Sequence, residues 1–217
     1  MNSFNELFNS LDLSAILAAL LRVLGVLLCL TVHETSHGLA AYVLGDPTAK
    51  REQRLSFNPL HHIDWLGFAS MLILGFGWAK PVPIDMRYFK KPKQGMAITA
   101  LAGPVSNLLL AVLLLLGGKA VYLWAPYTVV WDFVYYFLLR TAALSIGLGV
   151  FNLIPIPPLD GSKVLAAVLP DTAYSKLMHY ERYGMIAVLA LMYLGIGDNI
   201  LGQAITAVYT LLTNLIF

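Results

Sequence analysis

Residues 13–37 read LSAILAALLRVLGVLLCLTVHETSH, a nearly unbroken apolar run that ends in two histidines and a glutamate. About 20 consecutive apolar residues are enough to cross the hydrocarbon core of a bilayer as a helix. We therefore expect residues 13–32 to span a membrane, with Arg22 as the one charged interruption. The helical pattern continues to Leu44, and the following Gly45-Asp46-Pro47 is expected to end it.

The composition of the 217-residue chain indicates several such spans. Hydrophobic residues make up 59% of the chain and charged residues 12%, whereas soluble domains average about 45–50% and about 25%. The formal net charge of +2 is too small to indicate a nucleic-acid partner. The single cysteine, Cys29, excludes an intrachain disulfide. No linker or repeat divides the sequence, so we expect one membrane-embedded domain over residues 1–217.

Further apolar segments predict an all-α polytopic bundle of about four to six transmembrane segments. Residues 95–117 and 133–154 are clear spans, and residues 184–217 are either one broken span or two short ones. Residues 65–77 are apolar, but they are too few for a straight crossing and contain three glycines. A short re-entrant or β-like element is therefore expected near residues 65–85.

The distribution of basic residues predicts the orientation in the membrane. The first 21 residues contain no Lys or Arg, whereas loops 45–64 and 80–94 contain three and five. We therefore expect the N-terminus outside and both loops in the cytoplasm. His33 and Asp160 then both lie near the cytoplasmic side, so two segments distant in sequence can meet at one depth.

The sequence His33-Glu34-Thr35-Ser36-His37 is an HExxH motif. Residues four apart lie on one face of a helix, so both imidazoles can bind one zinc ion. Glu34 lies beside them, where its carboxylate can accept a proton from an activated water. A chance HExxH on a surface helix is the alternative. Ionisable groups at the end of a membrane span are costly and usually functional, so the motif favours a catalytic zinc site.

A catalytic zinc site needs a third protein ligand and an open position. The candidates are Asp64, Asp85, His61, His62, His179 and Asp160. Asp160 is favoured because it follows an apolar span, prolines 155, 157 and 158 oppose helix before it, and Gly161 permits a sharp turn. The alternative is that Asp160 only caps the helix expected from about residue 162. His61 and His62 either form a second metal site with Asp64 or are solvated loop residues.

Three motifs occur in order on apolar segments: HETSHGLAAY at 33–42, AGPVSN at 102–107 and NLIPIPPLDG at 152–161. Together with the loops NPLHHID and GWAKPVPI, this pattern resembles the site-2 protease family of intramembrane metalloproteases. The resemblance covers about residues 14–165 and is strongest to small bacterial and archaeal members. No insertion is long enough for a PDZ domain and no CBS pair is present, so the chain resembles a catalytic core.

The resemblance implies one zinc ion held by His33, His37 and Asp160, with Glu34 as general base. It implies hydrolysis of peptide bonds within or near the transmembrane segments of other membrane proteins. The expected location is the cytoplasmic membrane of a prokaryote, where the bilayer and a transmembrane substrate are the partners.

Two asparagines match family positions. Asn152 stands eight residues before Asp160 and is expected to contact the substrate backbone or the oxyanion. Its alternative role is a helix C-terminal cap. Asn107 is a substrate-binding candidate whose alternative is an interhelical hydrogen bond.

Residues 78–85 suggest how a substrate strand could be held. In an extended segment, Pro81 and Pro83 remove donors from one edge, while Lys80, Val82 and Ile84 keep theirs on the other. That second edge could pair with an extended substrate. The alternative is a stiff proline turn that only links two segments.

Two other functions fit part of the pattern. A membrane metal transporter or channel also needs intramembrane His and Asp, but it needs no glutamate beside the metal. A non-catalytic metal-binding membrane protein has no evident use for Glu34.

Overall fold

The computed structural model describes residues 13–74, 77–170 and 198–217, and single residues between 171 and 197. Its helices are α2 (Leu13–Val43), α3 (Thr48–Arg51), α4 (Trp65–Leu74), α5 (Pro92–Trp124), α6 (Val129–Asn152), α7 (Asp160–Val168) and α10 (Asp198–Ile216). Two 3-10 turns, η1 (Pro59–His61) and η2 (Met86–Tyr88), lie in the connections. The part of the chain described here contains no β-strand, and the predicted all-α class is confirmed.

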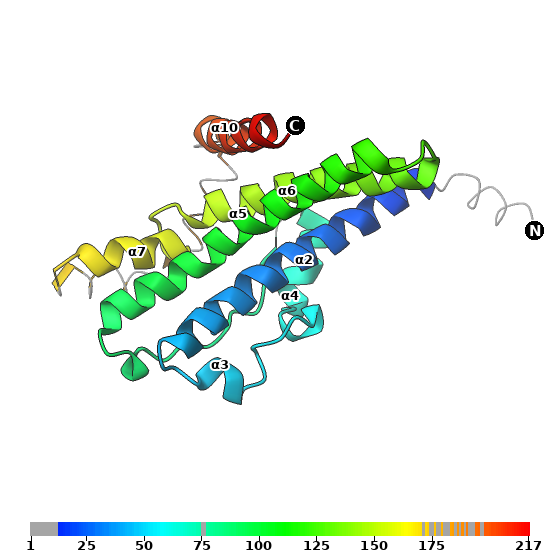
Figure 1. Cartoon of the computed structure of the whole chain (residues 1–217). Helices are drawn as coiled ribbons and strands as arrows, with labels where there is room; N and C mark the ends of the chain where they lie inside the picture. The colour runs from blue at the N-terminus through cyan, green and yellow to red at the C-terminus, as the bar shows by residue number, and fades with distance from the viewer. Residues whose placement is uncertain are drawn as a thin grey trace, which may run out of the picture.

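Four of these helices, α2, α5, α6 and α10, are long and apolar enough to cross a membrane. In Figure 1, α2, α5 and α6 run side by side, and α10 lies above α6 and contacts it. The chain is thus a polytopic membrane protein, as predicted. Residues 184–197, which decide whether the last apolar stretch holds a further span, lie largely outside the described residues.

The α5–α6 hairpin is longer than its predicted spans. Residues 118–132 were expected to connect the two helices, yet α5 continues to Trp124 and α6 begins at Val129. Lys119 lies within this extension of α5, and its ammonium group donates a hydrogen bond to the main-chain carbonyl of Ile216 at the end of α10. A lysine with this partner can remain inside an apolar helix without ending it.

Small side chains bring the three long helices into close contact. The buried core between α5 and α6 consists of Ala111, Leu114, Leu115, Ala142 and Ile146, and apolar residues of α10 pack against it. On α2, a Cβ atom on Gly25 would lie 2.9 Å from Thr141 Oγ1 of α6. Small residues at such contacts are typical of helix packing in membranes, where van der Waals contact holds helices together.

The segment 65–85 turns back on itself. α4 has ten residues and is about 15 Å long, which is too short to cross a bilayer. A Cβ atom on Gly67, near the start of α4, would lie 2.2 Å from the carbonyl oxygen of Trp78, beyond its end. Ala79 then forms an isolated antiparallel bridge with Ile63. This returning path agrees with the re-entrant, β-like element expected from the sequence.

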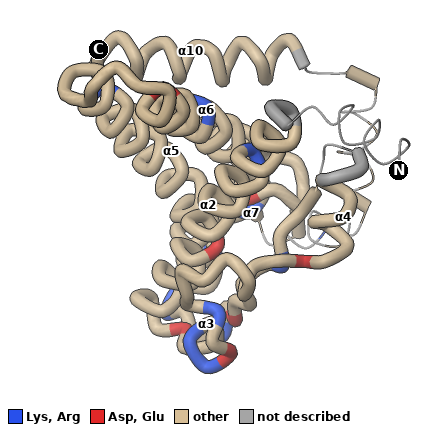
Figure 2. The backbone as a smooth tube through the Cα atoms, turned by 90° about the vertical axis from the view of Figure 1, so that its right-hand side faces the viewer, with Lys and Arg blue, Asp and Glu red and all other residues tan. Residues whose placement is uncertain are grey.

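Charged residues gather at one end of the bundle. Figure 2 shows many of the Lys, Arg, Asp and Glu positions around α3 and the loops beside it. Here Arg54 is buried and donates hydrogen bonds to the carbonyl oxygens of Lys80 (2.6 Å) and Pro81 (3.2 Å). These bonds tie the loop after α3 to the extended segment after α4.

Candidate metal centre

Three side chains from two distant segments meet inside the bundle. His33 and His37 lie on successive turns of α2, and Asp160 is the first residue of α7. The two Nε2 atoms are 3.0 Å apart, and Asp160 Oδ2 lies 3.1 Å from His33 Nε2 and 3.2 Å from His37 Nε2. All three residues are buried. Among the described residues this is the one group of His, Cys, Asp and Glu that could hold a metal ion.

The three donor atoms fit a zinc ion. Ligands about 2.0–2.1 Å from a tetrahedral zinc ion are separated from one another by about 3.3 Å. The observed separations of 3.0–3.2 Å are close to that value. Two imidazoles and one carboxylate also match the donor types of catalytic zinc sites, which keep a fourth position open. Asp160 offers Oδ2, while its Oδ1 lies 3.8 Å from Lys163 Nζ.

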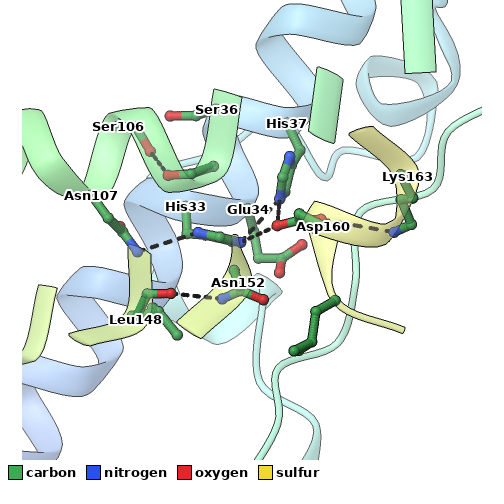
Figure 3. A network of polar contacts seen from close by, with 12 residues as sticks. His33, Glu34, Ser36, His37, Ser106, Asn107, Leu148, Asn152, Asp160 and Lys163 are labelled. Carbon is green, nitrogen blue, oxygen red and sulfur yellow. Dashed lines mark hydrogen bonds and ion pairs between the residues drawn. The ribbon is translucent and has the colours of Figure 1, made fainter. Parts of the chain in front are cut away.

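Helix α5 supplies a hydrogen-bond partner to each imidazole, and Figure 3 shows the one between Asn107 and His33. His37 Nδ1 lies 2.7 Å from the main-chain oxygen of Thr99. A carbonyl oxygen only accepts hydrogen bonds, so the ring proton of His37 lies on Nδ1. The lone pair of its Nε2 therefore faces the other two possible metal ligands, His33 and Asp160. His33 Nδ1 lies 3.2 Å from Asn107 Nδ2. Such partners orient the metal-binding histidines of zinc proteins.

Two glycines leave the space that this arrangement requires. A Cβ atom on Gly103 of α5 would lie 2.5 Å from His37 Nε2 and 2.6 Å from His33 Cε1. A Cβ atom on Gly161 would lie 2.2 Å from the carbonyl oxygen of Leu153. The role of Gly103 was not predicted, although the Gly-Pro pair in AGPVSN was a signal for it. Gly161 lies within α7 and its φ is not positive, so a glycine is needed there for the close approach to Leu153.

Glu34 faces the extended segment after α4. Its Oε2 accepts a hydrogen bond of 2.9 Å from the main-chain N–H of Val82. The N–H of Lys80 donates to the carbonyl oxygen of His62, also at 2.9 Å. Donors at 80 and 82 were expected to form an open edge for substrate, and in this structure both are already used within the chain. The extended path is as expected, but the edge is not free.

The other candidates for the third ligand lie away from the cluster. Asp64 Oδ1 accepts from the N–H of Gly67 (2.9 Å), and Asp85 pairs with Arg87 (2.6 Å). His62 Nε2 donates to the carbonyl oxygen of Ser56 (2.7 Å). The three histidines outside the motif, His61, His62 and His179, join no metal-binding group among the described residues. The alternative of a second metal site is therefore not supported.

The structure also places the two asparagines of the predicted site, and it tests whether Asp160 caps α7. Asn107 is fully buried and lies against His33 of α2, which matches its alternative role in an interhelical hydrogen bond, and its contact with substrate stays a prediction. The Asn152 side chain donates to the carbonyl oxygen of Leu148 (3.0 Å), one turn back in α6, which resembles the alternative local role. Asp160 does not cap α7, because it is the first helical residue and Leu159 occupies the cap position.

Comparison with known proteins gives consistent matches. Residues 127–195 match Peptidase family M50. The chain is 36% identical over 190 residues to "Putative zinc metalloprotease YwhC" of Bacillus subtilis, with 85% of each chain covered. It is 32% identical over 180 residues to "Putative zinc metalloprotease Rip2" of Mycolicibacterium smegmatis, covering 80% of this chain and 66% of that protein. No solved structure matches significantly.

Proposed function

Because the chain belongs to peptidase family M50, the site-2 protease family, we propose that it is an intramembrane zinc endopeptidase. Its substrates would be membrane proteins cut within or near their transmembrane segments. The observation that carries the proposal is the buried group of His33, His37 and Asp160 with Glu34 beside it. The relatives named as zinc metalloproteases support zinc as the metal, and one such group supports one ion.

The length of α5 supports an intramembrane position for the centre. Gly103, which contacts both histidines, is ten residues from Lys93 and 21 residues from Trp124 along α5. At 1.5 Å per residue, these intervals are about 15 Å and about 32 Å. A bilayer is about 40–45 Å thick with its headgroups. With Lys93 at one headgroup layer and Trp124 at the other, the centre lies well below the nearer surface.

The orientation is part of the proposal. Lys50 and Arg51 lie in α3 and Arg54 follows it, and α3 comes soon after the end of α2, the helix that carries both histidines. Figure 2 shows basic positions gathered around α3. Basic loops usually remain in the cytoplasm. We therefore place the active site near the cytoplasmic side of a prokaryotic cytoplasmic membrane.

The chain's own residues would divide the chemistry as follows. A zinc ion, when bound, acts as a Lewis acid that polarises the substrate carbonyl and lowers the pKa of the attacking water. His33, His37 and Asp160 would hold that ion. Glu34 would accept the proton of the water and deliver it to the leaving amine. Before a substrate binds, the hydrogen bond from Val82 holds the Glu34 carboxylate beside the centre.

A helical substrate has to be extended locally before a peptide bond can be reached. The segment with Lys80, Val82 and Ile84 is already extended and touches Glu34, so it would hold the substrate strand beside the centre. Pairing would transfer the Val82 N–H from Glu34 to a substrate carbonyl, and this exchange would release the Glu34 carboxylate to accept the proton of the water. Asn152, partly exposed on α6, would contact the substrate backbone or the oxyanion.

The position of cleavage tests this proposal. The purified protein is reconstituted in liposomes with single-span substrates, and the products are mapped by mass spectrometry. Soluble peptides that carry the juxtamembrane sequences of those substrates serve as controls. We expect cuts within or beside the spans. Cleavage of the soluble peptides alone would contradict an intramembrane protease while leaving a zinc peptidase intact.

A further inference from the structure

Asn107 is a buried amide with an unused polar atom. Its side chain is fully enclosed, and Nδ2 lies 3.2 Å from His33 Nδ1 (Figure 3). Its Oδ1 is buried and has no hydrogen-bond partner within the described part of the chain. A buried polar atom without a partner costs about 1–3 kcal/mol. Such an atom beside a metal-binding histidine calls for a chemical explanation.

Helix α6 packs against the main chain of Asn107, which lies within α5. Ser145 Oγ donates a 2.7 Å hydrogen bond to the main-chain oxygen of Asn107. A Cβ atom on Gly149 would lie 3.4 Å from Asn107 Cβ and 3.1 Å from the carbonyl oxygen of Pro104. The small residue therefore lets α6 close over this part of α5. Only the terminal amide group remains able to rotate, and its two orientations have nearly the same shape.

The two orientations favour different tautomers of His33. With Nδ2 toward the ring, the amide donates to an unprotonated Nδ1, and the ring proton lies on Nε2. That proton then points toward Asp160 Oδ2, 3.1 Å away. With Oδ1 toward the ring, the amide accepts a proton from Nδ1, and the lone pair of Nε2 is free for a metal ion. His37 lacks this choice, because its Nδ1 faces the carbonyl oxygen of Thr99.

We propose that Asn107 is the positioning residue that holds His33 in its metal-binding tautomer, by accepting the Nδ1 proton through its amide oxygen. The inference rests on the proposed zinc centre. It explains why a fully buried amide lies at this point of the α2–α5 contact, since an aliphatic side chain would leave the Nδ1 proton without an acceptor. The tautomer of His37 is then fixed by the main chain of Thr99, whereas the tautomer of His33 depends on the orientation of the Asn107 amide.

Zinc affinity tests the inference without any measurement of proteolysis. The full chain is purified in detergent, and its zinc dissociation constant is measured by competition with a chromogenic chelator. Asn107→Leu removes the acceptor at similar volume and should weaken zinc binding by about 10–100-fold, the usual effect of losing such a partner. Asn107→Asp keeps an acceptor at the same place and should stay within about threefold of the unmodified protein, since carboxylate–histidine–zinc arrangements are common.

Ser145→Ala is the matched control. It removes a hydrogen bond to the main chain of the same residue but leaves the His33 contact, so its zinc affinity should stay unchanged. Helicity by circular dichroism shows whether each variant is folded. If Asn107→Leu unfolds, Asn107→Ala carries the same expectation without a bulky side chain. The ¹⁵N chemical shifts of His33 in the zinc-loaded protein should also place the proton on Nδ1.

Two results would overturn the inference. One is a folded Leu or Ala variant that binds zinc as tightly as the unmodified protein. The other is a folded Asn107→Asp variant as weak as the Leu variant, because the acceptor would then be irrelevant. An unmodified protein that binds no zinc would instead overturn the proposed metal centre itself, and the inference with it.

Discussion

Replacement of Gly103 by alanine places a methyl group directly against both histidines of the metal centre. The new Cβ atom would lie 2.5 Å from His37 Nε2 and 2.6 Å from His33 Cε1, whereas ordinary van der Waals contacts begin at 3.4 Å. Either α5 or the imidazoles must therefore move by about 1 Å. Displacements of this size at a reacting centre lower rates by about 100-fold.

The assay compares zinc content and cleavage rate for Gly103→Ala and Gly117→Ala. Gly117 lies on the same helix, but its nearest contact would be an ordinary 3.5 Å to Leu138 Cδ1. Alanine is the better helix former in both places, by about 0.5–1 kcal/mol, so a loss in one variant alone cannot come from helix propensity. We expect Gly103→Ala to cleave about 100-fold more slowly or to lose zinc, and Gly117→Ala to behave like the unmodified protein. Equal behaviour of the two variants would refute the packing described for the centre.

Three further changes test other parts of the structure. Val82→Pro removes the N–H that donates a hydrogen bond to Glu34, and we expect cleavage to be at least about tenfold slower with unchanged zinc content. The control Val82→Ala keeps this donor. An equal loss of cleavage in Val82→Ala would show that the effect comes from side-chain packing. Asp160→Asn should weaken zinc binding, measured by chelator competition, by at least about 100-fold, because even partners outside the ligand set contribute about 10–100-fold. The control Lys163→Met removes only a 3.8 Å ion pair with the Asp160 carboxylate, and it should change the zinc affinity less than about fivefold. Similar losses of zinc affinity in the Asp160 and Lys163 variants would argue against Asp160 as a ligand. Lys119→Met removes the bond to the end of α10 and should lower thermal stability by about 1–2 kcal/mol with normal zinc content; an unchanged melting temperature would show that this bond does not hold α10.

The hydropathy pattern predicted the helical class well, because long apolar runs have few alternatives in a bilayer. The spans expected at 95–117 and 133–154 were shorter than the helices, because α5 continues to Trp124 and α6 begins at Val129. The partner of Lys119 is a carbonyl group 97 residues further along the chain, which no local pattern reveals.

The parts of the candidate site that depend on the spacing of residues within a motif could be predicted from the sequence. The HExxH spacing places two histidines on one face of any helix, and the turn before α7 brings Asp160 to them. Contacts between distant segments were not predictable in the same way. The bond from Val82 to Glu34 and the burial of Asn107 depend on how α2, α5 and the loop after α4 pack together.

The measurement that tests the central claim most directly is cleavage of single-span substrates in liposomes by the unmodified protein and by Glu34→Gln, with zinc quantified in both. We predict cleavage by the unmodified protein, loss of cleavage in the variant, and about one zinc ion per chain in each. Equal cleavage by the two proteins would contradict the role of Glu34. Absence of cleavage in both, with zinc bound, would contradict the protease itself and favour a metal transporter or a non-catalytic metal-binding protein.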